Sequence, residues 1–300
     1  MTAEPKLLEK DYPNLYQASD YASKSAQSNY ILIVAFDLIS MILASALAIY
    51  NYQSVNSKTS IYVISGVLLL LGFVLTIIII TKKFEDIWYQ GRALAESCKT
   101  LTWRFITCSE LFENSMTIQD AKTKFIERTK EFSQEFVELN KVLNAKKLNL
   151  PVITDPMLKI RQLSLVDRKA YYIRNRIEDQ KTWYSDKAEF NKKKYNFWFG
   201  IILTSQALSI VSISFLISNP KSDWNLVGLF TTIASSAISW LQLKQHQELK
   251  QAYTTASQEL NFIVALADQV QTENEFSTFV LDSENAISRE HTLWLAQKRK

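Results

Sequence analysis

The sequence predicts an all-α membrane protein with four transmembrane helices, arranged as two hairpins with long helical cytoplasmic extensions. Four apolar segments lie at 30–50, 61–80, 197–217 and about 226–243. Each is close to the ~20 residues that an α-helix needs to cross the hydrocarbon core of a bilayer. Only five Gly and five Pro occur in 300 residues, and no stretch alternates with the period of two that is typical of strands.

The placement of the basic residues predicts the orientation of these spans. The loop of the first pair carries one cation, Lys58, and the loop of the second pair carries one, Lys221. The other 32 of the 34 Lys and Arg lie outside the two hairpins. Because cytoplasmic loops are enriched in Lys and Arg, both termini and the central region are expected in the cytoplasm. These cations fit contacts with lipid headgroups, and we expect no nucleic-acid partner.

The chain has the form of a loose internal duplication. The first half, 1–150, holds two spans and cytoplasmic helices at 81–148. The second half, 151–300, holds a lead-in helix at 157–195, two spans and a cytoplasmic tail at 244–300. Pro151 and Pro156 stop helix on both sides of the boundary.

Three helices are expected to continue without a break between membrane and cytoplasm. They lack Gly and Pro over most of their length and cover 81–108, 174–194 and 242–270. A further helix is expected at 118–143, whose apolar residues recur at steps of three, four and seven. Its apolar face requires a partner helix, either in the same chain or in a neighbouring copy.

No signature of an enzyme is present in the sequence. It has no Gly-rich phosphate loop, no nucleophile elbow and no HExxH motif. Two histidines, His246 and His291, and two isolated cysteines, Cys98 and Cys108, do not form a metal-ligand pattern. We therefore expect no catalytic residues, no metal and no cofactor.

Small and polar residues follow one face of the fourth span. They recur at steps of four, three, four, three and four: Gly228, Thr232, Ser235, Ser239, Gln242 and His246. The third span adds Ser205, Ser209 and Ser212. Such stripes either let helices pack closely, with hydroxyls bonding across the seam, or line a wet pore. Both readings stay open, and these residues are candidates for the pore lining or for contacts between spans.

Asp37 is the only formal charge within the four segments, about two turns into the first span. A carboxylate at that depth is costly and faces protein or water rather than lipid. It fits a structural hydrogen bond to a neighbouring span, a gate, or a ring of carboxylates along a cation path.

A second group of candidates lies on the helix that follows the second span. Arg92, Glu96, Lys99 and Trp103 step by four, three and four and so share one face. Arg92 can pair with Glu96, and Glu96 with Lys99, along the helix. Trp88 suits the aromatic belt at the membrane surface. These five residues are candidates for coupling or gating.

Three motifs resemble those of a known family. They read WYQGRALAESCKTLTWRF at 88–105, RIEDQKTWYSDKAEFNKKK at 176–194 and ENAISREHTLW at 284–294. They resemble motifs of the SLATT proteins, the "SMODS and SLOG-associating two-transmembrane" effectors. The second and third motifs add Trp183, Arg289 and Glu290 to the candidates for coupling.

The resemblance implies a pore-forming effector of a bacterial anti-phage system. Such a protein would permeabilise the inner membrane of an infected cell and cause growth arrest or death. Several copies of the chain would be needed to surround a pore. The trigger would be a nucleotide second messenger or a sensor protein, although no separate nucleotide-sensing domain is evident. The alternative is a membrane scaffold that docks a soluble partner and conducts nothing.

Overall fold

The computed structural model describes residues 6–298, with side chains described as far as Ser288. Among the described residues, the regular secondary structure is helical apart from one isolated β-bridge, which confirms the all-α prediction. It divides into two compact units, each built from separate stretches of sequence. Unit 1 contains 1–27, 85–187 and 252–300, and unit 2 contains 28–84 and 188–251.

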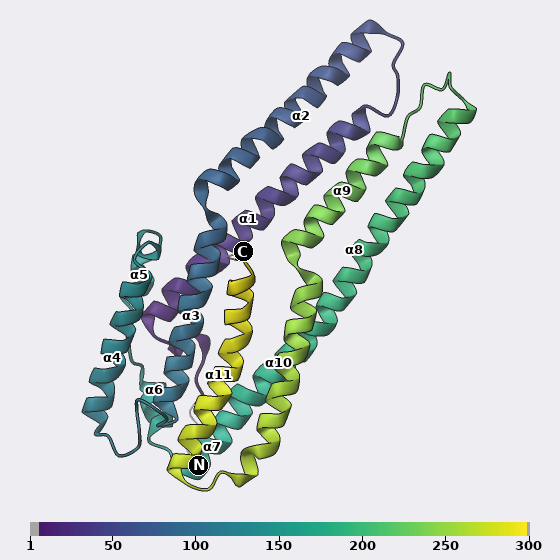
Figure 1. Ribbon diagram of the computed structural model, residues 1–300. Helices are drawn as coiled ribbons and strands as arrows, with labels where there is room; N and C mark the ends of the chain where they lie inside the picture. The colour runs from purple at the N-terminus through teal and green to yellow at the C-terminus, as the bar shows by residue number, and fades with distance from the viewer. Residues whose placement is uncertain (1–5, 299–300) are drawn as a thin grey trace. The chain divides into compact units, whose positions relative to one another are not determined.

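Unit 1 is a helical bundle with a conventional buried core. Its helices are α3 (Phe84–Ile106), α4 (Ile118–Glu135), α5 (Ala145–Leu148), α6 (Asp155–Arg161), α7 (Leu165–Tyr172), the π-helix η3 (Ile173–Glu178) and α11 (Glu273–Lys298). The first turns of α1 (Asn14–Leu47), the start of α8 (Asp179–Ser218) and most of α10 (His246–Leu266) complete it, with short 3-10 turns at Glu9–Asp11, Leu139–Lys141 and Ala267–Gln269. Figure 1 labels the α-helices along the chain. Helix α3 supplies the fully buried Leu94 and Phe105 to this core.

The apolar face expected at 118–143 packs within the chain. Phe125 is fully buried, and Leu139 joins the same core. The helix is shorter than predicted, because α4 ends at Glu135 and the chain continues as turns and a 3-10 helix. The lead-in helix predicted at 157–195 is also interrupted, since α6 ends at Arg161 and Ser164 caps the start of α7.

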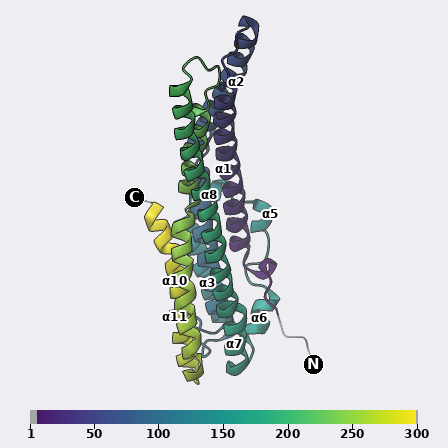
Figure 2. The ribbon, with the colours of Figure 1, turned by 90° about the vertical axis from the view of Figure 1, so that its right-hand side faces the viewer.

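Unit 2 contains the four apolar segments. They lie in α1, α2 (Val55–Lys82), α8 and α9 (Val227–Lys244), which run alongside one another (Figure 1 and Figure 2). Three helical runs of the described chain are long and apolar enough to cross a membrane: Asn14–Leu47, Val55–Ile106 and Leu165–Ser218. The fourth expected span, α9, is helical but is not one of them, because its hydroxyl and amide residues make it less apolar.

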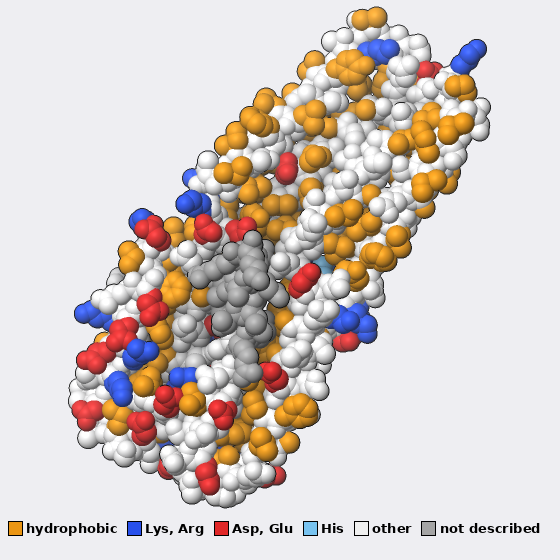
Figure 3. Space-filling view, viewed as in Figure 1, with side chains coloured by type: hydrophobic (Ala, Val, Ile, Leu, Met, Phe, Trp, Pro, Cys, Tyr) orange, Lys and Arg blue, Asp and Glu red, His pale blue; other side chains and the backbone are white. Residues whose placement is uncertain are grey.

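The outer surface of unit 2 is apolar, as expected of helices in contact with lipid. Side chains such as Val63, Leu70 and Phe73 of α2 are exposed. Figure 3 shows apolar side chains over α2 and α8, whereas acidic and basic side chains gather over α3 and α4 of unit 1. The two units therefore expose surfaces of different chemistry.

An antiparallel bridge joins the two loops that connect the apolar helices within each pair. Tyr50 pairs with Trp224, and their ring centroids lie 4.9 Å apart. The Asn51 amide donates to the Asp223 carbonyl at 2.7 Å, and the Asn225 amide donates to the Ile49 carbonyl at 2.7 Å. The two apolar pairs are thus tied together by their loops, a connection that no sequence pattern indicated.

Two of the three helices expected to be continuous are broken by a single residue. Lys83 separates α2 from α3 with φ 47°, and Gln245 separates α9 from α10 with φ 47°. Both residues adopt the left-handed conformation, which stops the i to i−4 hydrogen-bond ladder. The breaks lie at corresponding places, each after the second apolar helix of a pair. The helix leading into the third segment is continuous, since α7, η3 and α8 follow without a gap.

Candidate functional site

A fully buried ion pair lies at the centre of unit 1. Arg176 of η3 donates to Glu284 of α11 through Nε at 2.8 Å and through Nη2 at 2.7 Å. Glu284 also accepts from the Tyr172 hydroxyl at 3.0 Å and from the Thr100 hydroxyl at 2.8 Å. The carboxylate therefore receives four hydrogen bonds, and both its oxygens are satisfied.

The charge of this pair is maintained by its partners and not by water. Arg176 and Glu284 are 2% and 0% exposed. Burial acts to lower the pKa of Arg176, but the Glu284 carboxylate outweighs burial, so the pKa of this guanidinium is raised. A bidentate pair of this kind specifies one arrangement of the helices, because any other arrangement leaves a charge buried without its partner.

The local backbone at Arg176 is unusual. Ile173–Glu178 forms a π-helix between α7 and α8. Such a bulge is rare, and it changes which residues of a continuous helix face the core. Here it brings both Arg176 and Ile177 into buried positions.

Trp103 lies against the same ion pair. The Arg176 guanidinium stands 5.9 Å from the centre of the Trp103 ring, and Tyr172 meets that ring edge-on at 5.7 Å. Trp103 is almost completely buried, unlike the partly exposed Arg92 and Glu96 with which it was predicted to share a face. Its side chain lies inside the core and not on the surface of α3.

Arg92 and Glu96 do form the expected ion pair, with 2.9 Å between Arg92 Nη2 and Glu96 Oε1. Lys99, one turn further on, is half-buried. Burial lowers the pKa of Lys99, and the nearby Glu96 carboxylate partly opposes that effect. These three residues form a charged edge beside the buried pair.

The beginning of α3 is held against the first turns of α1. A methyl group on Gly91 would lie only 3.0 Å from the Ser19 carbonyl oxygen, so the glycine permits close approach of the two helices. The Ser23 hydroxyl donates to the Trp88 carbonyl at 2.9 Å. The Trp88 and Tyr89 rings stack with their centroids 4.9 Å apart. Both residues lie in the first two turns of α3.

Helices α8 and α10 meet through aromatic rings in unit 1. The Trp183 ring lies 5.3 Å from Tyr253, and Tyr184 stacks on the same Tyr253 at 5.7 Å. Trp183 is still partly exposed. The side chains of Arg289 and Glu290 lie outside the described residues.

Within unit 2, Asp37 is placed between α1 and α2. A methyl group on Gly72 would lie 2.9 Å from Asp37 Oδ1 and 3.3 Å from the Ser40 hydroxyl. Ser40 and Ala44 are buried on the same face of α1. The small-residue side of α1 therefore packs against α2 at Gly72, with the carboxylate at the contact.

The polar stripe of α9 lies mostly on the outside of unit 2. Gly228, Ser235, Ser239 and Gln242 are exposed, and Thr232 is half-exposed. The residues of α9 that pack inside are instead Ala234, Ser236 and Ala237. A methyl group on Gly228 would meet no atom within 4 Å, so this glycine serves no close helix contact within the chain.

His246 does not belong to that stripe, contrary to the sequence-based expectation. The break at Gln245 starts a new helix, and His246 turns inward to contact Asn191 of α8, with 2.7 Å between His246 Nδ1 and Asn191 Oδ1. Burial, together with Lys244 and Lys194, lowers the pKa of His246 to about 4.

On α8, the three candidate serines differ in accessibility. Ser205 is buried, whereas Ser209 and Ser212 are half-exposed. The Ser212 hydroxyl donates to the Leu208 carbonyl of its own helix at 2.7 Å. Only Ser205 is therefore placed as an internal contact of unit 2.

Comparison with known families decides the identity. The family model described as "SMODS and SLOG-associating 2TM effector domain 3" matches residues 13–169, more than half of the chain. The chain belongs to the SLATT family. A second model, "SMODS and SLOG-associating 2TM effector domain 1", matches residues 172–294. Neither the curated proteins nor the solved structures include a match.

The chain thus carries two SLATT domains in tandem, and they share their structural units. Thr100 and Trp103 belong to the first SLATT match, whereas Arg176 and Glu284 belong to the second. All four meet in the core of unit 1. The buried ion pair is therefore where the two SLATT domains interlock, and neither domain completes that core alone.

Sequence reasoning on the SLATT motifs missed the two residues at the centre of this site. Arg176 opens the second motif and Glu284 opens the third, yet neither was among the candidates. The available signal was a charged residue beginning each motif, but the sequence does not reveal that the two charges are buried together. Among the described residues, no group of three or more His, Cys, Asp or Glu could hold a metal ion.

Proposed function

We propose that this SLATT protein is a pore-forming membrane effector that assembles as a homo-oligomer and permeabilises the bacterial inner membrane. In this proposal α9 is the fourth span, completing two transmembrane hairpins with helical cytoplasmic extensions. Its 18 residues extend about 27 Å at 1.5 Å per residue, close to the ~30 Å hydrocarbon core. The sparse cations of the two outer loops favour cytoplasmic termini.

The observation that carries the proposal is the outward-facing polar stripe of α9. Ser235 and Ser239 are exposed, and Gly228 contacts nothing beyond its own helix within 4 Å. Polar groups facing hydrocarbon are costly, so this surface requires either another copy of the chain or water. A ring of copies that turns this stripe toward its centre supplies both.

Asp37 is proposed as the gate or selectivity residue. Its carboxylate lies at the close contact between α1 and Gly72 of α2. A change in how these two helices pack would alter its exposure, and a ring of such carboxylates would favour cations.

The trigger is proposed to act on unit 1, either as a nucleotide signal or as a partner protein. Helices α1, α8 and α10 each begin in one unit and end in the other. A change in packing around Arg176 and Glu284 can therefore be transmitted along continuous helices, as in other two-state switches. Trp88, Arg92, Glu96, Lys99, Trp103 and Trp183 are the proposed coupling residues.

Leakage from liposomes tests the pore. Purified protein would be reconstituted with an encapsulated dye, and Ser235→Leu and Ser239→Leu would be compared with Ile238→Leu, a control change at an exposed position off the stripe. The proposal expects leakage that both serine variants reduce and the control retains. Correctly inserted, oligomeric protein that leaks neither dye nor ions, with the cellular trigger supplied, would overturn it.

The scaffold remains the second candidate, because some hydroxyls of the stripe are already satisfied. The Thr232 hydroxyl donates to the Gly228 carbonyl of its own helix at 2.8 Å, so it needs neither water nor a ligand. A scaffold predicts that the wild type does not conduct ions and that Ser235→Leu disrupts its assembly. Chemical crosslinking of the same variants separates the two functions.

A further inference from the structure

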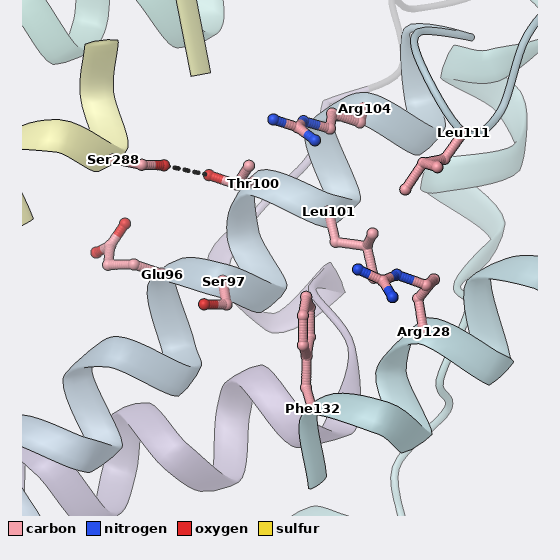
Figure 4. Close-up of a pocket in the computed structure, with 9 residues that line it drawn as sticks. All are labelled: Glu96, Ser97, Thr100, Leu101, Arg104, Leu111, Arg128, Phe132 and Ser288. Atoms are coloured by element: carbon pink, nitrogen blue, oxygen red, sulfur yellow. Dashed lines mark hydrogen bonds between the residues drawn. The ribbon is translucent and has the colours of Figure 1, made fainter. Parts of the chain in front are cut away.

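A pocket of unit 1 presents two arginines from different helices. It has a volume of about 190 Å³ and lies between α3, α4 and α11. Arg104 comes from α3 and Arg128 from α4, as Figure 4 shows. Three hydroxyl residues also line it: Ser97, Thr100 and Ser288.

Both arginines have a buried donor without a hydrogen-bond partner. Nε of Arg104 and Nε of Arg128 are shielded from solvent, and neither has a partner among the described residues. Most buried polar atoms in proteins are hydrogen-bonded, so an unpaired buried donor is unusual. Two guanidinium groups from different helices beside one pocket favour a ligand that supplies acceptors.

Their remaining guanidinium contacts position these donors. Arg104 Nη2 donates to the Asn285 side chain at 3.2 Å. Arg128 Nη1 pairs with Glu131, and the Arg128 guanidinium lies 5.8 Å from the centre of the Phe132 ring. Both side chains are therefore held in place.

The chemistry of the lining favours an oxyanion. A guanidinium has donors and no acceptor, so its ligand must offer oxygen lone pairs. Arginine recognises phosphate with two parallel hydrogen bonds, and hydroxyls can donate to further oxygens. Glu96, the acidic residue on the rim, is already paired with Arg92. The pocket is smaller than the ~300–1,000 Å³ of sites for drug-sized molecules, so it fits one charged group.

We propose that this pocket binds the phosphate group of a phosphorylated small molecule or of a lipid headgroup. The proposal goes beyond membrane permeabilisation and does not depend on it, since a chain that conducts nothing could still bind phosphate here. Arg104 and Arg128 are the principal binding residues. The Ser97 hydroxyl lies beside them in the lining, whereas the Thr100 hydroxyl already donates to Glu284.

Calorimetric titration of the full chain in detergent micelles tests binding. The probes are sodium pyrophosphate, ATP and short-chain phosphatidic acid, with sucrose as the uncharged control. Arg104→Gln and Arg128→Gln are each expected to weaken phosphate binding about 10-fold or more, the loss expected for a charge-assisted hydrogen bond. Lys130→Gln, which removes an exposed cation two residues from Arg128 on α4, should bind as the wild type does.

A variant that is expected to tighten binding distinguishes loss of the site from misfolding of the protein. Glu131→Gln removes the carboxylate that competes for Arg128 and should tighten binding, whereas Glu127→Gln, an exposed neighbour on α4, should tighten it less. Tight binding of phosphatidic acid alone assigns the site to a lipid headgroup, and binding of pyrophosphate or ATP assigns it to a soluble ligand. Absence of saturable binding by all three probes, or equal binding by Arg128→Gln and wild type, overturns the proposal.

Discussion

Removing the charge of Glu284 should destabilise unit 1 more than any surface change. Glu284→Gln keeps the size of the side chain but replaces one carboxylate oxygen with an NH₂ group. In the wild type, the Glu284 oxygens accept all four hydrogen bonds. An NH₂ group cannot accept a hydrogen bond, so it would face donor groups that have lost their acceptor. The buried Arg176 would then lack a countercharge.

The expected loss follows from the burial of both partners. Breaking a fully buried ion pair by removing one charge costs about 3–5 kcal/mol. Folded domains have only about 5–15 kcal/mol of total stability, so the variant should unfold at a much lower temperature. Exposed substitutions stay within about 0.5 kcal/mol, and Glu127→Gln on the exposed side of α4 provides that control.

Thermal unfolding of the full chain in detergent, followed by tryptophan fluorescence, measures the loss. Trp103 lies beside Arg176, so its emission reports on this core. The double variant Arg176→Met, Glu284→Met should lose less than the sum of the two single variants, because it leaves no unpaired charge. A Glu284→Gln variant as stable as Glu127→Gln would refute the reasoning.

Three further predictions concern unit 2 and its borders. Gly72→Leu should lower thermal stability in micelles more than Gly72→Ala, since Asp37 Oδ1 and the Ser40 hydroxyl would lie 2.9 and 3.3 Å from a methyl group and can yield to it more easily than to a larger side chain; equal melting temperatures of the two variants would refute the tight packing of α1 on α2. Lys83→Val should lose about 1–2 kcal/mol relative to Lys83→Gly, because a β-branched residue resists the left-handed conformation at φ 47°; equal melting temperatures of the two variants would show that the break can move. His246 stays neutral in the folded chain down to its pKa of about 4, whereas an unfolded His takes up a proton below its ordinary pKa of 6.5. Stability should therefore fall between pH 6.5 and 4, by up to roughly 3 kcal/mol at about 1.4 kcal/mol per pKa unit, and His246→Gln, which keeps a polar group beside Asn191, should remove most of that dependence in pH-resolved melts.

The sequence predicted the parts of the fold that depend on local pattern. The four apolar segments are helical, Pro151 follows α5 while Pro156 lies in the first turn of α6, and the Arg92–Glu96 pair forms at its helical spacing. Each of these depends on residues within a few positions of one another. The sequence did not predict the breaks between α2 and α3 and between α9 and α10, because nothing in the side chains of Lys83 or Gln245 requires the left-handed backbone found there.

For the candidate site, the sequence pattern does not reveal which charged and polar residues are buried. Arg176 and Glu284 are 108 residues apart and read as ordinary solvated charges until the helices that carry them are packed together. The outward direction of Ser235 and Ser239 likewise depends on which side of α9 the small residues Ala234 and Ala237 occupy. A helical pattern defines a face, but only the neighbouring helices decide whether that face is inside or outside.

By itself, therefore, the sequence determined that this SLATT chain is helical, that it belongs in a membrane and where its apolar segments begin and end. Hydrophobic length, charge asymmetry and motif are local properties, and each can be read without a partner. Tertiary structure alone decided that the two tandem SLATT domains share one core, where Thr100 of the first donates to Glu284 of the second, and that Tyr50 and Trp224 join the loops of the two apolar pairs. Those decisions depend on contacts between residues more than a hundred positions apart, where the free energy comes from packing and burial and not from local propensity.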